Sequence, residues 1–113
     1  MDVAAELSPA VDAVIDNHLD TGTSVVLEGD QLLPLARPGV HPIVLHEPAK
    51  EQLIANYRSR EPAAGDQIER AVVSRLHGDL LVARAAAAGV PVVVARPWAD
   101  VVDRVLAALA LEA

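Results

Sequence analysis

The 113-residue sequence contains no cysteine and no phenylalanine, and its only aromatic residues are one tryptophan and one tyrosine. Without cysteine the chain can form neither a disulfide framework nor a thiolate metal site. No apolar run reaches the roughly 18 residues that a membrane-spanning helix needs. The first residues lack the basic start of a secretory signal. These absences predict a soluble, cytoplasmic protein that has no membrane partner.

Basic residues are also scarce, since nine Lys and Arg stand against 16 Asp and Glu, giving a net charge of -7. An acidic chain is a poor match for the phosphate backbone of nucleic acids, so a nucleic-acid partner is not expected. The hydrophobic fraction of 52% excludes a disordered chain and indicates an aliphatic core. The length is that of one domain, which we expect to span residues 1–113.

Apolar periodicity and the positions of Pro and Gly divide the chain into seven elements. In the predicted helices, apolar residues recur at a spacing of three to four residues. The predicted strands are short runs rich in β-branched residues. The order predicts an α/β fold with a parallel sheet of about three strands, flanked by helices in three layers. The predicted elements are a helix at 8–21, strands at 23–28 and 43–47, helices at 49–60 and 66–88, a strand at 91–95 and a helix at 99–111.

Local signals mark several helix ends and faces. Ser8-Pro9 is typical of a helix start, Asp66 with Glu69 resembles a capping box, and Gly89 suits the end of the longest helix. That helix carries a continuous apolar stripe, and in the last helix one face is expected to point inward. The stripe consists of Ile68, Val72, Leu76, Leu80, Ala83 and Ala87, and the inward face of Val101, Val102, Val105, Leu106 and Leu109.

Polar or turn-forming residues follow each predicted strand, where ligands of open parallel sheets bind. Glu28 and Asp30 lie two residues apart, and a carboxylate there can hold Mg²⁺ through water or accept a proton. A charge at a strand end is also compatible with simple solvation, so both interpretations stay open. The complete set is Glu28, Gly29, Asp30 and Gln31, then His46 and Glu47, then Arg96, Pro97 and Trp98.

Arg58 and Arg60 leave a predicted helix for a loop rich in Pro, Ala and Gly. Arginine binds phosphate through paired hydrogen bonds, so a mobile loop carrying two arginines could close over a nucleotide. The alternative is that both arginines form surface ion pairs with Glu61 and Asp66. The four histidines, at positions 18, 41, 46 and 77, show no metal-binding spacing, so no metal site is predicted from them.

Three segments read together resemble P-loop small-molecule kinases, most closely the 2-phosphoglycerate kinase-like proteins and more broadly AAA-type P-loop NTPases. They are SVVLEGDQLLP at 24–34, IVLHEPAKEQLIANYRSRE at 43–61 and AAAGVPVVVARPW at 86–98. The resemblance implies transfer of a phosphoryl group from ATP, with Mg²⁺, to a small hydroxyl compound. It implies that Glu28 and Asp30 hold Mg²⁺ or the acceptor.

The same resemblance assigns roles to the remaining site residues. Asp30 and Gln31 fall in the acceptor-binding loop, with Gly29 and Gln31 as substrate-binding residues, although the family usually has His where this chain has Gln31. Arg58 and Arg60 take lid positions. Arg96 and Pro97, with Trp98 beside them, take the positions of the loop that touches adenine.

One departure from the family is large, because the phosphate-binding loop Gly-x-x-x-x-Gly-Lys-Ser/Thr is absent. That loop supplies the backbone cradle, the lysine and a Mg²⁺ ligand. The chain therefore resembles the C-terminal half of a kinase, inactive alone. We expect direct pairing of strands 23–28 and 43–47, a homodimer, or a partner chain that carries the P-loop. The alternative function is a non-catalytic α/β protein-interaction module, and a Rossmann-like domain is disfavoured because Gly-x-Gly-x-x-Gly is missing.

Overall fold

The computed structural model describes residues 3–110, and its residues group into two compact units. The first unit comprises Met1–Leu33 and Arg37–Val40, and the second comprises Pro34–Ala36 and His41–Ala113. Helix α1 (Val3–Thr21) belongs to the first unit, and every other helix and strand belongs to the second. The single-domain organisation of residues 1–113 stays a prediction, because compact grouping does not show that a unit folds by itself.

Helix α1 begins at Val3, earlier than the predicted start at residue 8, and it contains Pro9 in its interior. The residues at 4–7 are Ala, Ala, Glu and Leu, which are strong helix formers and extend the helix backwards past the predicted cap. Gly22 ends the helix as expected, with φ of 68°. The Thr23 amide donates to the His18 carbonyl across this turn, at 3.0 Å.

The predicted strand at 23–28 is wrong, because the structure gives these residues no regular secondary structure. Val26 is 91% exposed and its neighbours Val25 and Leu27 are also exposed. The run has high strand propensity, but a strand exists only where a neighbouring strand satisfies its N–H and C=O groups. The strand predicted at 43–47 pairs instead with the one predicted at 91–95.

The loop that completes the first unit is tied to α1 by one arginine and one glycine. Arg37 forms ion pairs with Asp16 and, at 3.8 Å, with Asp12. The hydrogen bond to the Asp16 carboxylate raises the pKa of Arg37. Gly39 has φ of 79°, and a Cβ there would lie 2.6 Å from Cδ2 of Leu19. A larger residue at this position would therefore displace the end of the Leu19 side chain and strain the backbone.

The sheet of the second unit has two parallel strands, β1 (Val44–His46) and β2 (Val92–Val94), rather than the predicted three or so. Val44 is opposite Val92 and His46 is opposite Val94. The ladder extends by one bond at each end: Val44 donates to the Pro91 carbonyl at 3.0 Å, and Ala95 donates to the His46 carbonyl at 2.8 Å. The α/β class with a parallel sheet is confirmed, with a smaller sheet than expected.

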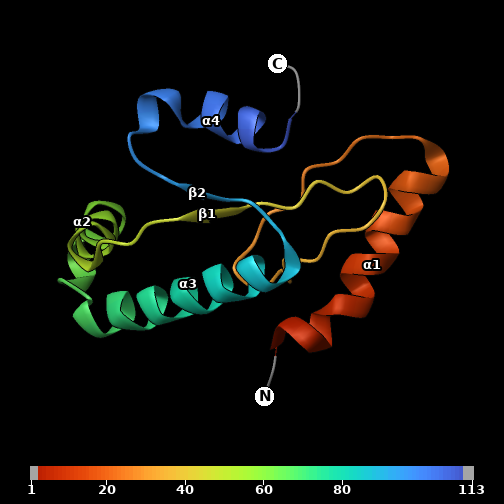
Figure 1. Ribbon diagram of the computed structural model, residues 1–113. Coiled ribbons are helices and arrows are strands. Elements are labelled where there is room, and N and C mark those ends of the chain that lie inside the picture. The colour runs from red at the N-terminus through yellow and green to blue at the C-terminus, as the bar shows by residue number, and fades with distance from the viewer. Residues whose placement is uncertain (1–2, 111–113) are drawn as a thin grey trace. The chain divides into compact units, whose positions relative to one another are not determined.

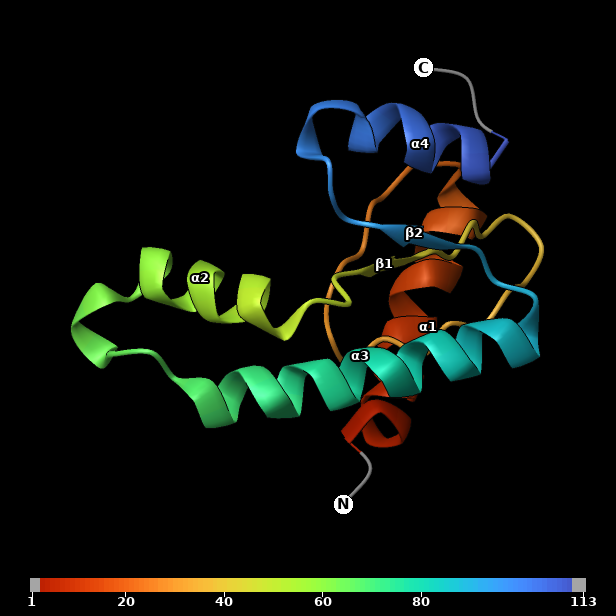
Figure 2. The same ribbon diagram turned by 60° about the vertical axis from the view of Figure 1, so that its left-hand side comes forward.

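Two helices connect the strands and a third follows them. They are α2 (Lys50–Arg60), α3 (Ile68–Ala88) and α4 (Val101–Ala108), with short 3-10 turns at Pro62–Ala64 and Trp98–Asp100. These helices lie within the predicted spans 49–60, 66–88 and 99–111, whose last residue is outside the described part. Figures 1 and 2 show α3 along one side of the strand pair and α4 along the other.

The two ends of α3 are built differently. The predicted capping box does not form: Gln67 precedes the helix with φ of 50°, no side chain caps it, and Asp66 bonds to Arg58 instead. At the other end Gly89, with φ of 69°, donates to the Ala86 carbonyl, while Val90 donates to the Ala85 carbonyl at 2.9 Å. This pair of bonds is the Schellman motif, which needs a left-handed residue.

The face of α3 that packs inward carries small side chains. Ala71 and Ala85 are fully buried, and a Cβ on Gly78 would lie 3.3 Å from Nδ1 of His46. Ala85 forms the core cluster together with Val44 of β1 and Val90. The small residues let the helix axis approach the strands closely, as in other tight helix packings.

Leu81 and Val82 pack against this core cluster, but most of the large aliphatic residues of α3 lie outside the packed face. Ile68, Val72, Leu76 and Leu80, four members of the predicted stripe, are all exposed. In α4 the prediction of an inward face is wrong for Val102, which is 66% exposed. The apolar stripe of α3 therefore contributes no buried core within the chain.

Candidate functional site

The carboxyl ends of the two strands bring Glu47 and Arg96 together. Because His46 and Val94 are paired and Ala95 bonds back to His46, the chain leaves both strands at the same level of the sheet. Nε of Arg96 donates to Oε1 of Glu47. This is the edge where ligands of parallel sheets bind. We call Glu47, Arg96 and the neighbouring Trp98 the strand-end cluster.

The carboxylate of Glu47 is the most constrained charge of the cluster. Its side chain is 8% exposed, whereas that of Arg96 is 43% exposed. Oε2 of Glu47 is buried and accepts no hydrogen bond within the described residues. A buried oxygen without a partner costs on the order of 1–3 kcal/mol, more when it is charged. The ion pair with Arg96 therefore offsets the free-energy cost of burying this carboxylate.

Arg104 on α4 fixes the loop that carries Arg96 and Trp98. Its guanidinium donates to the Val94 carbonyl at 2.6 Å and to the Pro97 carbonyl at 2.7 Å. A third bond, at 3.0 Å, reaches the Asp100 carboxylate. The sequence analysis did not find Arg104, since a side chain that binds carbonyls leaves no motif. The one sequence signal for Arg104 was its position four residues after Asp100, a spacing that favours an ion pair on a helix.

Trp98 lies at the start of the 3-10 turn that follows β2. Its side chain is among the large exposed apolar groups, at 56% exposure. Trp98 follows Arg96 by two residues, so the loop after β2 carries both an exposed flat apolar ring and a donor of hydrogen bonds. Such a pair suits stacking of a ring or docking of another protein.

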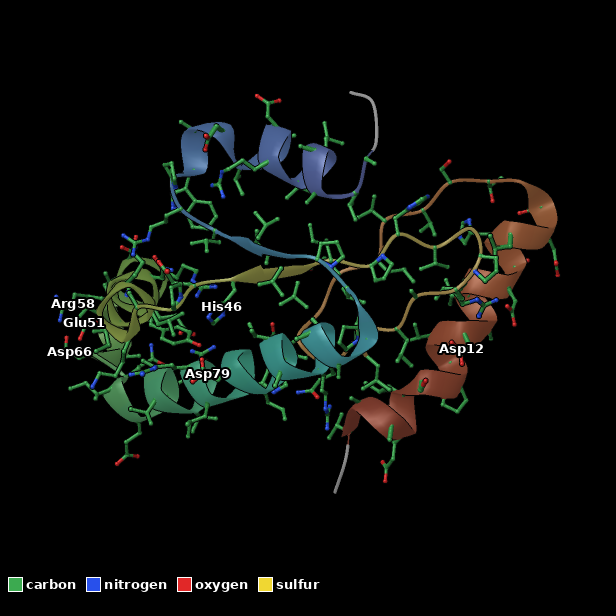
Figure 3. The ribbon with its side chains drawn as sticks, viewed as in Figure 1. Asp12, His46, Glu51, Arg58, Asp66 and Asp79 are labelled. Atoms are coloured by element: carbon green, nitrogen blue, oxygen red, sulfur yellow. The ribbon has the colours of Figure 1, made fainter. Side chains whose placement is uncertain are left out.

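The predicted lid arginines are not brought to this cluster. Arg58 lies eight residues after the start of α2, about 12 Å along the helix. Figure 2 shows α2 leading away from the strands, and Figure 3 shows Arg58 beside Asp66. Nη2 of Arg58 is 2.7 Å from Oδ1 of Asp66. Arg60 lies over the Tyr57 ring, with its Cζ 5.2 Å from the ring centroid.

A polar network around Tyr57 joins the end of α2 to α3. The Tyr57 ring is buried, its hydroxyl is 2.5 Å from that of Ser74, and the Arg70 guanidinium lies 4.2 Å from the ring centroid. Arg70 also pairs with Glu61 at 2.5 Å. Hydrogen bonds from Gln67 and then Arg70 lower the pKa of Glu61. The arginines of this region therefore stabilise the turn between α2 and α3. For Arg58 this agrees with the alternative prediction, a surface ion pair with Asp66.

The predicted acceptor residues belong to the first unit and follow no strand in the sequence. Glu28, Gly29, Asp30 and Gln31 are all exposed, and the Leu32 amide donates to the Gly29 carbonyl in a turn. Since residues 23–28 form no strand, the argument that placed these four at a strand end no longer applies. Their proposed roles rest on the kinase resemblance alone.

Among residues 3–110 no group of three or more His, Cys, Asp or Glu side chains is placed to hold a metal ion. None of the helices in the same range is both long and apolar enough to cross a membrane. No family model, no curated protein and no solved structure matches the chain.

Proposed function

We propose that this chain is an α/β protein-interaction module without chemistry of its own, whose exposed apolar surface is covered by another polypeptide. One observation carries the proposal: within residues 3–110, no large side chain is fully buried. The core consists of alanines, of valines and of Tyr57, and the valines and Tyr57 all keep some exposure. Large aliphatic residues lie outside it on α1, on α3 and in residues 25–27.

The energetics favour completion by a partner. A two-stranded sheet is marginal in water by itself, so its stability depends on the helices packed against it. Full burial of a Val, Leu or Ile side chain contributes about 1.5–3 kcal/mol. The exposed aliphatic residues leave much of this stabilisation unused in the isolated chain. An exposed apolar patch of this kind marks an interaction site in natural proteins.

Binding of the dye ANS to the purified chain tests this proposal. ANS fluoresces on exposed apolar surface, and a natively packed monomer binds little of it. We expect ANS binding from a chain that also shows a cooperative thermal transition and near-UV signal from Trp98. A folded chain that binds no ANS at any concentration would show that its apolar residues are already covered, and the proposal would fail.

A second candidate is the partial P-loop-kinase-like domain, completed into a three-layer sheet by a chain that carries the P-loop. The strand-end cluster favours it, because Arg96 and the exposed Trp98 lie at the ligand-binding edge of the sheet. Trp98 fits stacking on adenine. The sequence offers no glycine-rich cradle and no Gly-Lys pair for the phosphates or Mg²⁺, so the chain alone performs no phosphoryl transfer.

Titration with Mg·ATP and Mg·ADP, followed by Trp98 fluorescence and calorimetry, separates the two candidates. A micromolar response that Arg96→Ala weakens would favour the kinase-like half. Silence up to millimolar nucleotide from a folded chain would remove that candidate and leave the interaction module. Arg58→Ala and Arg60→Ala should weaken phosphate binding only in a complex with a P-loop-bearing partner, because in this chain both arginines bind local groups.

A further inference from the structure

The outward face of α3 is a long apolar seam. Ile68, Val72, Leu76 and Leu80 follow one another at intervals of four residues, and all four are exposed. Leu76, at the middle, is 63% exposed. Ala83 and Ala87 continue the row, so that it covers about 28 Å of helix. A seam of this kind is the pattern by which one helix packs on another.

Four charged side chains border this seam, two of each sign. At 3.6 residues per turn, Arg75 and Asp79 border it on one side, and Glu69 and Arg84 lie toward the other side. Within residues 3–110 none of the four forms an ion pair with another group, unlike Arg58 and Arg70 nearby. No ion pair among the described residues therefore uses these four charges.

The positions of the charges are self-complementary in one orientation. The pair Arg75 and Asp79 and the pair Glu69 and Arg84 are both centred within one residue of Leu76. If a second copy packs antiparallel across a two-fold axis near Leu76, Arg75 faces the second copy's Asp79 and Glu69 faces its Arg84. In a parallel pair, Glu69 of one copy would face Glu69 of the other and Arg84 would face Arg84, so that like charges would meet. Symmetric dimers commonly use such self-complementary surfaces.

We propose that α3 is a homodimer interface, in which two copies pack their apolar seams antiparallel about a two-fold axis at Leu76. This deepens the proposed interaction function, on which it rests, by naming the partner as a second copy of this chain. The seam supplies the affinity, and the four charges that border it set the orientation, since such pairs contribute little energy each. One helix per copy is a small interface, so we expect dissociation in the micromolar range.

Sedimentation equilibrium of the full chain, from about 1 µM to about 500 µM, measures this association. The wild-type chain should pass from monomer to dimer over that range. Leu76→Lys should remain monomeric throughout, because it places two ammonium groups at the axis. The matched control is Val102→Lys, at a residue on α4 that is as exposed as Leu76, and it should dimerise like the wild type.

A charge exchange tests the orientation with little risk to folding. Arg75→Glu and Asp79→Arg should each weaken the dimer about tenfold, because each places like charges opposite one another in both symmetry-related contacts. The double variant should recover the wild-type dissociation constant, since it restores opposite charges across the axis. A double variant that dimerises no better than the single ones would overturn the antiparallel arrangement.

Two further outcomes separate this proposal from the function on which it rests. A chain that stays monomeric at all concentrations and still binds ANS would overturn the second copy as partner and leave the interaction module standing. A monomeric, folded chain that binds no ANS would overturn both. Equal loss of dimer in Leu76→Lys and Val102→Lys would place the interface elsewhere and overturn the α3 proposal.

Discussion

Replacing Arg96 by methionine should destabilise the protein more than replacing any arginine whose ion pair lies at the surface. Methionine keeps much of the aliphatic stem but removes the one group that bonds to the Glu47 carboxylate. Glu47 would then be a buried charge with neither oxygen satisfied, since Oε2 already lacks a partner among the described residues. Within residues 3–110 no other side-chain ion pair joins the two strand ends.

The expected magnitude follows from the exposure of the two partners. Removing one member of a fully buried ion pair costs roughly 3–5 kcal/mol. Here Glu47 is buried but Arg96 is partly exposed, so water screens the pair and can reach the carboxylate once the guanidinium is gone. We therefore expect Arg96→Met to lower the free energy of unfolding by about 2 kcal/mol.

Urea unfolding followed by far-UV circular dichroism measures this loss, with all variants at one protein concentration because self-association adds to apparent stability. The matched control is Arg58→Met. Arg58 and Asp66 are 59% and 52% exposed, so breaking that pair should cost less than about 1 kcal/mol.

A double-mutant cycle completes the test. In a Glu47→Gln background the carboxylate charge is absent, so Arg96→Met should cost less than about 1 kcal/mol there. If Arg96→Met is no more destabilising than Arg58→Met, or costs the same with Gln at position 47, then Arg96 does not compensate a buried charge and the strand-end cluster loses its physical basis.

Three other predictions concern single residues, each checked by unfolding measurements. Gly89→Ala should cost about 1 kcal/mol, because φ there is 69°; an unchanged melting temperature would contradict the strained turn. Tyr57→Phe should cost about 1 kcal/mol through the lost bond to Ser74, and Tyr57→Phe should be nearly neutral when Ser74 is already Ala. The Gln67 bond lowers the pKa of Glu61 below its ordinary 4.5, so its stabilisation is present above that pH and is lost as pH falls through the lower native value. Glu61→Gln should flatten the acid limb of stability, and an unchanged limb would refute this.

The strands show what the sequence could and could not predict. Residues 43–47 and 91–95 were predicted correctly as strands, because a short β-branched run between helices and beside Pro is a local signal. The run at 23–28 has the same local signal, yet it forms no strand. Whether a strand forms depends on a partner that is distant in the sequence, and composition carries no information about that partner.

Helix α3 shows a second limit. Periodicity correctly located the stripe from Ile68 to Ala87 but could not say which face packs on the sheet. The structure packs the face with Ala71, Gly78 and Ala85, because small residues allow close approach to strands of only three residues. A large aliphatic stripe on a helix is therefore evidence of burial somewhere, not of burial within the same chain.

The candidate site was predictable in part. The rule that functional residues follow parallel strands led to Glu47, Arg96 and Trp98, and the structure brings the first two into an ion pair. The same rule failed for Glu28 and Asp30, because it depended on a strand that does not form. The roles of Arg58 and Arg60 were open between a lid and local pairing, and the structure shows each of them bound to a local group.

Cross-linking through an engineered cysteine tests the central claim, association through α3, most directly. The natural chain contains no cysteine, so every disulfide in Leu76→Cys joins two copies at that residue. Helix axes about 8–10 Å apart leave facing Cα atoms about 3.4–5.4 Å apart, which overlaps disulfide geometry. We predict rapid formation of a covalent dimer under mild oxidant, while Val102→Cys remains a monomer. No cross-link in Leu76→Cys at concentrations of about 100 µM, or equal cross-linking in both variants, would contradict the claim.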